Sequence, residues 1–198
     1  MAQPPSFDRE AAERAIAALI RSLGLDPASE PELSQTPGRV ADLYAEIFAG
    51  LDPATAPDLA LFPQPQGSGE DLVVVRDLPF YSLCVHHFVP FFGHAHVAYL
   101  PGRQLLGISG VARVLEHYAR RPQLQERIGT QVADHLERAL APRGLAVVLE
   151  ARHLCMEMRG IRKFGRVETR TLRGTLADPR WAAALPAGRG ESVDPHAV

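Results

Sequence analysis

The sequence predicts a protein of the α+β class, with an antiparallel sheet and grouped helices. Two helical patterns come first, runs of β-branched residues follow, and two further helical patterns precede the last strands. Grouping of this kind favours an antiparallel sheet over a doubly wound parallel one. The chain has 198 residues, 46% of them hydrophobic and 22% charged, which suits one soluble globular domain with a small N-terminal appendage.

The first part of the chain predicts two helices. Apolar residues recur at helical spacing over about residues 8–23, and Gly24 ends that pattern. A second helix is expected to start near Thr36, which can act as a cap, with Pro37 in the first helical position. Its apolar stripe continues to Gly50. We therefore expect an N-terminal helical region over residues 1–50.

We expect residues 51–198 to form the second, larger domain. Proline and glycine in residues 52–70 indicate a connecting loop. Two helices are expected in the middle of this domain, the first capped by Ser109 and the second running through residues 124–140. The expected strands cover residues 72–76, 94–100, 145–156 and 167–172.

Charge and apolar patterning limit the possible classes of function. A formal net charge of −2 gives no electrostatic case for binding nucleic acid or an anionic membrane. No segment approaches the roughly 20 apolar residues of a membrane helix. Residues 1–5 lack the basic start and apolar run of a signal peptide. We therefore expect a cytoplasmic protein, in which cysteine thiols stay reduced.

Both cysteines lie close to histidines in the sequence. Cys84 and His87 have C-x-x-H spacing, and Cys155 follows closely after His153. The cysteines could form a disulfide, serve as inert core residues or bind a metal, and a reducing compartment argues against the disulfide. As metal ligands, Cys84, His87 and Cys155 would leave a fourth zinc position for water, which is the pattern of a catalytic site. Bound zinc makes hydroxide available at neutral pH.

Two histidines next to these residues are candidates for proton transfer. Side chains alternate along a strand, so a strand through residues 145–156 would place His153 and Cys155 on the same face. His86 remains available if His87 binds the metal. Because the pKa of histidine is near neutrality, this pair could act as acid and base beside a zinc ion.

Four separate segments of the sequence together resemble a known family. They lie at residues 84–90, 107–113, 123–127 and 153–160. Their order and spacing are similar to those of GTP cyclohydrolase I, and the similarity runs from Thr36 to about Gly174. Because four motifs in register are hard to obtain by chance, the resemblance is specific.

The resemblance implies a fold, an assembly and a reaction. Family members have the tunnelling fold, an antiparallel sheet with a pair of helices, and assemble into a homo-oligomeric ring that is usually a decamer. The active sites lie between subunits. The enzyme uses zinc to open the imidazole ring of GTP, releases formate and forms 7,8-dihydroneopterin triphosphate, the first step of tetrahydrofolate and pterin biosynthesis.

The resemblance also implies a role for individual residues. Three residues match the zinc ligands, namely Cys84, His87 and Cys155. Three match residues at the reacting part of the nucleotide, namely the proton-transferring His86 and His153 and the ribose-proximal Ser109. Five match the substrate pocket, in which Glu126 and Gln125 face the purine and cations surround the triphosphate, namely Arg39, Arg113 and Arg159.

Two positions depart from the family pattern. Val85 replaces a glutamate within the zinc motif, and Gly110 replaces a lysine that helps to hold the triphosphate. Loss of one charge-assisted bond costs about 1.5–3 kcal/mol, which is roughly a ten- to hundredfold loss of affinity. Cations elsewhere could replace this charge, namely Arg162, Lys163 or Arg166. The alternatives are a paralogue acting on a different or less phosphorylated purine nucleotide, and an inactive ring subunit that binds a purine or pterin.

Overall fold

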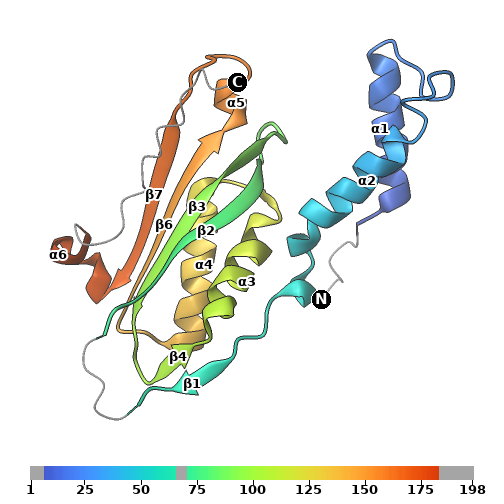
Figure 1. Cartoon of the computed structure of the whole chain (residues 1–198). Coiled ribbons are helices and arrows are strands. Elements are labelled where there is room, and N and C mark those ends of the chain that lie inside the picture. The colour runs from blue at the N-terminus through green and yellow to red at the C-terminus, as the bar shows by residue number, and fades with distance from the viewer. Residues whose placement is uncertain (1–6, 66–70, 183–198) are drawn as a thin grey trace. The chain divides into compact units, whose positions relative to one another are not determined.

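The structure, a computed structural model, describes residues 7–65 and 71–182 of the chain (Figure 1). It divides into two compact units, residues 1–56 and residues 57–198. None of the described helices is both long enough and apolar enough to cross a membrane.

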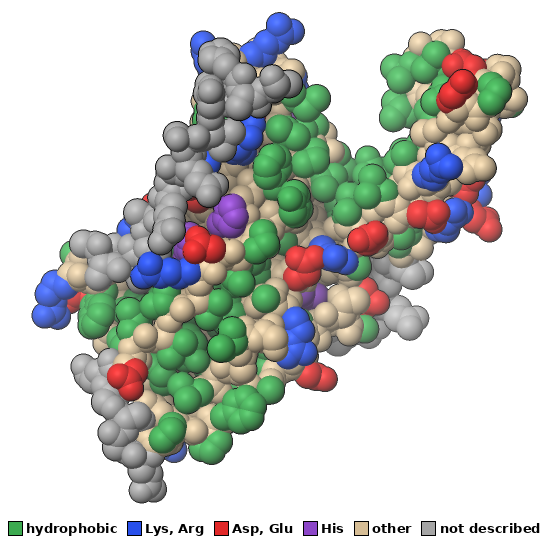
Figure 2. All heavy atoms as spheres, in the orientation of Figure 1, with side chains coloured by type: hydrophobic (Ala, Val, Ile, Leu, Met, Phe, Trp, Pro, Cys, Tyr) green, Lys and Arg blue, Asp and Glu red, His purple; other side chains and the backbone are tan. Residues whose placement is uncertain are grey.

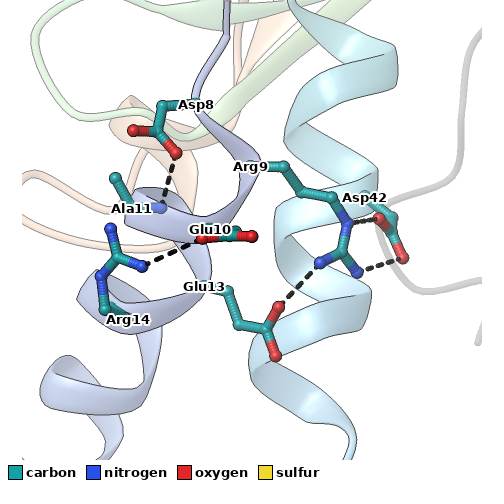
Figure 3. Close-up of polar contacts among 7 residues, drawn as sticks. All are labelled: Asp8, Arg9, Glu10, Ala11, Glu13, Arg14 and Asp42. Atoms are coloured by element: carbon teal, nitrogen blue, oxygen red, sulfur yellow. Dashed lines mark hydrogen bonds and ion pairs between the residues drawn. The ribbon is translucent and has the colours of Figure 1, made fainter.

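The first unit is a helical hairpin of α1 (Arg9–Ser22) and α2 (Thr36–Ile47). Asp8 caps α1, because its carboxylate accepts a 2.9 Å hydrogen bond from the Ala11 N–H. The Arg9 guanidinium joins the two helices, donating from Nε to Asp42 at 2.6 Å and from Nη1 to Glu13 at 2.7 Å (Figure 3). Both predicted helices are confirmed.

The predicted helix caps at Thr36 and Ser109 are wrong. Thr36 is the first residue of α2 itself, and its hydroxyl donates to the Glu32 carbonyl instead of accepting from the helix. Ser109 is the second residue of α3 (Ile108–Ala119), which has Gly107 at its cap position. Helix α2 also ends at Ile47, and a 3₁₀ turn, η1 (Ala49–Leu51), follows it.

The second unit contains a five-stranded sheet in the order β5-β2-β3-β6-β7. Its strands are antiparallel to one another except for the parallel pair of β2 and β5. They are β2 (Val73–Cys84), β3 (Pro90–Leu100), β5 (Pro122–Gln123), β6 (Gly144–His153) and β7 (Arg166–Gly174). The predicted α+β class and antiparallel sheet are confirmed, although β2 and β3 are longer than expected.

Helices α3 and α4 (Gln125–Leu140) pack together on one face of this sheet (Figure 1). The four-residue spacing of Ile128, Val132 and Leu136 places these residues on a single stripe of α4, and all three are fully buried. They belong to the same core as Val147 and Leu149 of β6. Burial of each such side chain contributes about 1.5–3 kcal/mol. This core fixes α4 against the sheet that carries the candidate site.

The predicted loop over residues 52–70 is wrong in part. It contains a 3₁₀ turn, η2 (Pro53–Thr55), and a short strand, β1 (Leu61–Pro63), which pairs antiparallel with β4 (Gln104–Leu106). A three-residue strand is too short to show an alternating pattern, which explains why the prediction missed it. The rest of that prediction, residues 66–70, lies outside the described residues.

The strand predicted over residues 145–156 ends early. Strand β6 stops at His153, and a single helical turn, α5 (Leu154–Glu157), follows it. Arg152 and Glu157 form a 2.7 Å ion pair across this turn, and the Met158 N–H donates to the Leu154 carbonyl at 2.9 Å. The argument from strand alternation that placed His153 and Cys155 on one face is therefore wrong, because Cys155 is helical. Two short C-terminal elements are η3 (Thr175–Ala177) and α6 (Pro179–Ala182).

Candidate metal centre

A tight turn between β2 and β3 carries the first half of the centre. Cys84 ends β2, and its carbonyl accepts hydrogen bonds from the N–H groups of His87 at 3.2 Å and Phe88 at 2.8 Å. Phe88 has a positive φ of 52°, as such a reversal requires. The Cys84 N–H closes the turn by donating to the Val89 carbonyl at 2.9 Å. As a result Cys84 is buried while His86 and His87 are exposed.

The sheet brings Cys155 to this turn. Phe91, at the start of β3, pairs in register with His153 at the end of β6, so α5 begins beside the β2–β3 turn (Figure 1). The ligand atoms of Cys84, His87 and Cys155 all lie within 4.8 Å of one another. The Cys84 Sγ is 3.9 Å from the His87 Nδ1.

This donor set fits a tetrahedral metal ion. Bond lengths of about 2.3 Å to sulfur and 2.0 Å to nitrogen place tetrahedral ligand atoms about 3.5–3.8 Å apart. The Cys84 Sγ–His87 Nδ1 separation of 3.9 Å is already close to this range, while the limit of 4.8 Å for the whole group exceeds it by about 1 Å. Thiolate and imidazole ligands favour zinc over magnesium or calcium, and they also accept ferrous iron.

The electrostatics of the two thiols also favour a bound metal ion. Burial raises the pKa of Cys155, and the nearby Cys84 raises it further. Two neighbouring thiols resist ionising together, and a cation between them removes this cost by favouring both thiolates. The raised pKa of Cys155 therefore makes its thiolate depend on a nearby positive charge, which a bound cation would supply.

His86 and Arg159 flank the three candidate ligands. The Nδ1 of His86 is also 3.9 Å from the Cys84 Sγ, although His86 does not belong to the three-residue ligand group. The Nη1 of Arg159 lies 2.7 Å from the Nε2 of His87. One side of the His87 ring therefore faces a thiol and the other faces a guanidinium.

His153 is held beside the centre by two contacts. The ring of Phe91 stacks on it with centroids 4.7 Å apart and planes only 4° apart. Its Nε2 lies 2.8 Å from the Oε1 of Gln125. Burial lowers the pKa of His153, while the charges of Glu126 and Glu157 act in the opposite direction. A lowered pKa keeps the imidazole neutral at pH 7 and able to accept a proton.

The first two residues of α4 have opposite environments. Gln125 is only 2% exposed, and its amide contacts protein groups. Glu126 is exposed and lines a shallow groove of about 450 Å³ between α4 and β7, together with Thr130, Thr169 and Arg170. Glu126 is thus accessible to a ligand, whereas Gln125 is enclosed.

Three predicted site residues are not brought to the metal centre by any described contact. Ser109 and Arg113 are exposed on the first turns of α3. Arg39 lies in the first unit, where its Nη2 donates to Gln35 at 2.9 Å. Among the cations considered as replacements, Arg166 pairs with Glu150 at 2.5 Å.

Gly110 is buried in the packing between α3 and its neighbours. A Cβ atom at this position would lie 2.9 Å from Cδ1 of Leu106 and 3.2 Å from Cδ2 of Leu59. Leucine side chains therefore cover position 110.

Sequence reasoning missed two residues that support the site. Phe91 stacks on His153, but the predicted strand began only at residue 94, so the Phe91–His153 pair was not foreseen. Arg152 binds Glu157 and also lies over the ring of Phe164, 4.8 Å from its centroid. The alternation of side chains along the predicted strand over residues 145–156 indicates that Arg152 and His153 face opposite sides. It does not identify the partners of Arg152.

The fold and the centre together define a class of protein. An α+β domain that gathers two thiols and one imidazole close to a further histidine has the donor set of a metal-dependent enzyme, because three protein ligands leave a fourth position open for water or substrate.

Comparison with known proteins identifies the family. The GTP cyclohydrolase I family matches residues 12–185, and the chain belongs to this family. A protein from Halalkalibacterium halodurans named GTP cyclohydrolase 1 is 47% identical over 180 residues, covering 89% of this chain and 94% of its own length. Its namesake from Mycolicibacterium gilvum is 47% identical, covering 96% and 91%. A third, from Thermoanaerobacter pseudethanolicus, is 45% identical, covering 85% and 89%.

A search of solved structures found a crystal structure of an archaeosine synthase QueF-like protein in the apo form. It is 19% identical, with a TM-score of 0.39, and the match covers 52% of this chain and 95% of that one.

Proposed function

We propose that this protein is a zinc-dependent GTP cyclohydrolase I. It hydrolyses the imidazole ring of GTP and gives formate and 7,8-dihydroneopterin triphosphate, the first step of tetrahydrofolate and pterin biosynthesis. The observation that carries the proposal is the group of Cys84, His87 and Cys155 beside His153. The relatives that carry the name GTP cyclohydrolase 1, at 45–47% identity, support it.

The proposed chemistry is divided between the metal and the surrounding side chains. Cys84, His87 and Cys155 hold the zinc, which supplies Lewis acidity for hydrolysis at C8 when it is bound. His153 accepts and returns protons during ring opening, and the exposed His86 serves as its counterpart.

The remaining predicted residues bind the nucleotide. Glu126 accepts hydrogen bonds from N1 and the amino group of guanine, which rejects bases without these donors. The predicted site also includes Ser109 near the ribose and Gln125 near the purine. The predicted triphosphate cations, which suit phosphate because guanidinium makes paired charge-assisted bonds, are Arg39, Arg113 and Arg159.

The proposal includes a tunnelling fold and assembly into a homo-oligomeric ring, a decamer with active sites between subunits. Several large apolar side chains remain exposed in the second unit, namely Phe88, Met158, Ile161 and Phe164. Figure 2 shows apolar side chains gathered over the tip of the β2–β3 hairpin. Contiguous apolar surface of this kind is typical of an interface between proteins, and it supports assembly next to the metal centre.

The proposal also includes a cytoplasmic location and a role for each of the two domains. Cys84 and Cys155 are free thiols in the structure, and thiol ligands persist in a reducing compartment such as the cytoplasm. We assign catalysis to residues 51–198 and treat residues 1–50 as a helical extension.

A second candidate is a paralogue that acts on a less phosphorylated purine nucleotide. The buried position of Gly110 favours it, because Leu59 and Leu106 occupy the space beside this residue and it offers no charge to a phosphate. An inactive binding subunit is the remaining alternative, although such a protein would have no need for the metal group and His153 together.

The test is to incubate the zinc-loaded protein with GTP, GDP, GMP and guanosine, and to measure formate and the fluorescent pterin. Product from GTP at the highest kcat/KM supports the main proposal. A preference for GDP, GMP or guanosine would instead assign the paralogue function. Absence of product from all four, with zinc bound, would leave the binding role.

A further inference from the structure

The amide of Gln125 connects three elements at the base of the site. Gln125 is the first residue of α4, and its Nε2 donates to the carbonyl oxygens of Leu149 on β6 at 3.0 Å and Val167 on β7 at 2.8 Å. The Thr169 hydroxyl is a third neighbour of the same nitrogen, at 3.2 Å. Both amide hydrogens are therefore used within the protein.

These contacts fix the orientation of the amide. The carbonyl oxygens of Leu149 and Val167 can only accept hydrogen bonds, so the group that faces them must be the NH₂ group. Rotating the amide by half a turn would place Oε1 against two other oxygens. The Oε1 of Gln125 must therefore point toward His153, whose Nε2 is 2.8 Å away.

The fixed amide in turn fixes the hydrogen on His153. An amide oxygen can only accept, so the neutral imidazole must carry its hydrogen on Nε2. The lone pair of the ring is then on Nδ1. Phe91 stacks on the ring at 4.7 Å and holds its plane, while Gln125 fixes its rotation within that plane.

We infer that Gln125 is a positioning residue that holds His153 as the Nε2–H tautomer and leaves Nδ1 as its proton-transferring atom. The inference rests on the proposed function for the role of His153. It assigns Gln125 a different role from the predicted one in the purine pocket, because Gln125 acts through His153 and not through a bond to the base. A hydrogen bond to one ring nitrogen selects which nitrogen is available for chemistry.

The test compares Gln125→Met with Gln125→Glu in the assembled, zinc-loaded protein. Methionine keeps the length of the side chain but neither accepts nor donates as an amide, so kcat should fall about 10- to 100-fold. The KM for GTP and the zinc content should stay within about threefold of wild type, since loss of a transition-state interaction lowers kcat without weakening ground-state binding. In Gln125→Glu, burial favours the protonated carboxyl group, whose hydroxyl can donate to the Leu149 or Val167 carbonyl while its other oxygen accepts from His153. This variant should therefore recover part of the loss in kcat.

Gln123→Met is the matched control. Gln123 is equally buried and also donates to a main-chain carbonyl, that of Tyr118 at 2.9 Å, but it has no contact with His153. A purely structural role for Gln125 would make the two methionine variants alike in kcat. A raised KM with unchanged kcat in Gln125→Met would show instead that Gln125 binds the purine, and would overturn the inference.

A spectroscopic measurement separates this inference from the proposed function. In the ¹⁵N spectrum of histidine-labelled protein at pH 8.5, the resonances lost in His153→Asn identify His153. The wild type should show a protonated Nε2 and an unprotonated Nδ1, and Gln125→Met should show a mixture of tautomers. A protonated Nδ1 in the wild type would overturn the inference even if GTP is turned over. Absence of turnover with the expected tautomer would overturn only the proposed function.

Discussion

At the scale of single residues, the positions of the two cysteines assign them most clearly to one function, that of metal ligands. Cys84 lies at the buried end of β2 and Cys155 in a single helical turn, yet their sulfur atoms and a ring nitrogen of His87 all lie within 4.8 Å of one another. Burial and the nearby Cys84 raise the pKa of Cys155, and a bound cation would offset both effects. Their contacts distinguish the roles of the two histidines. His87 belongs to the ligand group, whereas His153 contacts Gln125 and Phe91.

The first prediction concerns metal binding and turnover. His87→Ala and Cys155→Ala should lose bound zinc and formate release together, since each removes one of three ligands. His153→Ala should keep its zinc, while turnover falls about 10²- to 10⁴-fold through loss of acid–base catalysis. Elemental analysis after dialysis and a formate assay provide the two readouts. Loss of zinc in His153→Ala but not in Cys155→Ala would contradict this assignment of ligands.

At the scale of elements, the approach of β3 to β6 positions the site. Gly93 lies on β3 two residues after Phe91 and pairs with Ala151 on β6. A Cβ atom at Gly93 would overlap the Glu150 carbonyl oxygen and would lie 2.7 Å from the Cα of Ala151. A side chain here would separate the strands whose pairing brings α5 to the β2–β3 turn.

The second prediction tests this close approach. Gly93→Ala should lower the free energy of unfolding by about 1–3 kcal/mol, because the added atom meets backbone that must shift. Gly38→Ala in α2 is the control, since its nearest neighbours are side-chain atoms at 3.5 Å. That change should stabilise the protein by up to about 1 kcal/mol, as alanine is the better helix former. Urea unfolding measures both, and equal effects would show that the β3–β6 approach is not tight.

At the scale of the whole molecule, one buried and one half-buried histidine couple stability to pH. His96 is only 4% exposed, and its Nδ1 accepts a 3.1 Å hydrogen bond from the Asp77 N–H, so protonation at Nδ1 would break that bond. Burial lowers the pKa of His96, with Asp77 and Glu150 acting against this shift and His94 and Arg76 adding to it. Burial also lowers the pKa of His135, and Arg138 adds to that shift.

The third prediction is the resulting loss of stability in acid. A histidine with a lowered folded-state pKa binds fewer protons when folded than when unfolded, so its contribution is complete above the unfolded pKa of 6.5. It is lost as the pH falls below that value, with a slope of at most about 1.4 kcal/mol per pH unit for each histidine. The urea concentration at the unfolding midpoint should therefore decrease as the pH is lowered from 8 to 5. His96→Asn keeps an acceptor for the Asp77 N–H and should show a shallower decrease, and an unchanged slope would exclude His96 as a source.

Several features of the site followed from the sequence because they depend on local order. The C-x-x-H spacing placed Cys84 and His87 on one turn, and the Cys155–His153 proximity followed from adjacency alone. By contrast, the contact of Gln125 with His153 joins residues 28 apart in the chain. No spacing rule predicts it, because it depends on how α4 packs against β6 and β7.

By itself the sequence determined the α+β class, the apolar stripes of the helices, the family and the identity of the three candidate metal ligands. These follow from residue type and from the order and spacing of motifs along the chain, which the chain carries in any conformation. Only the tertiary structure decided that Cys155 lies in a helical turn, that Leu59 and Leu106 cover Gly110, and that Gln125 is enclosed while Glu126 is open. The reason is that burial and hydrogen-bond partners are set by strand register and helix packing, which join residues distant in sequence.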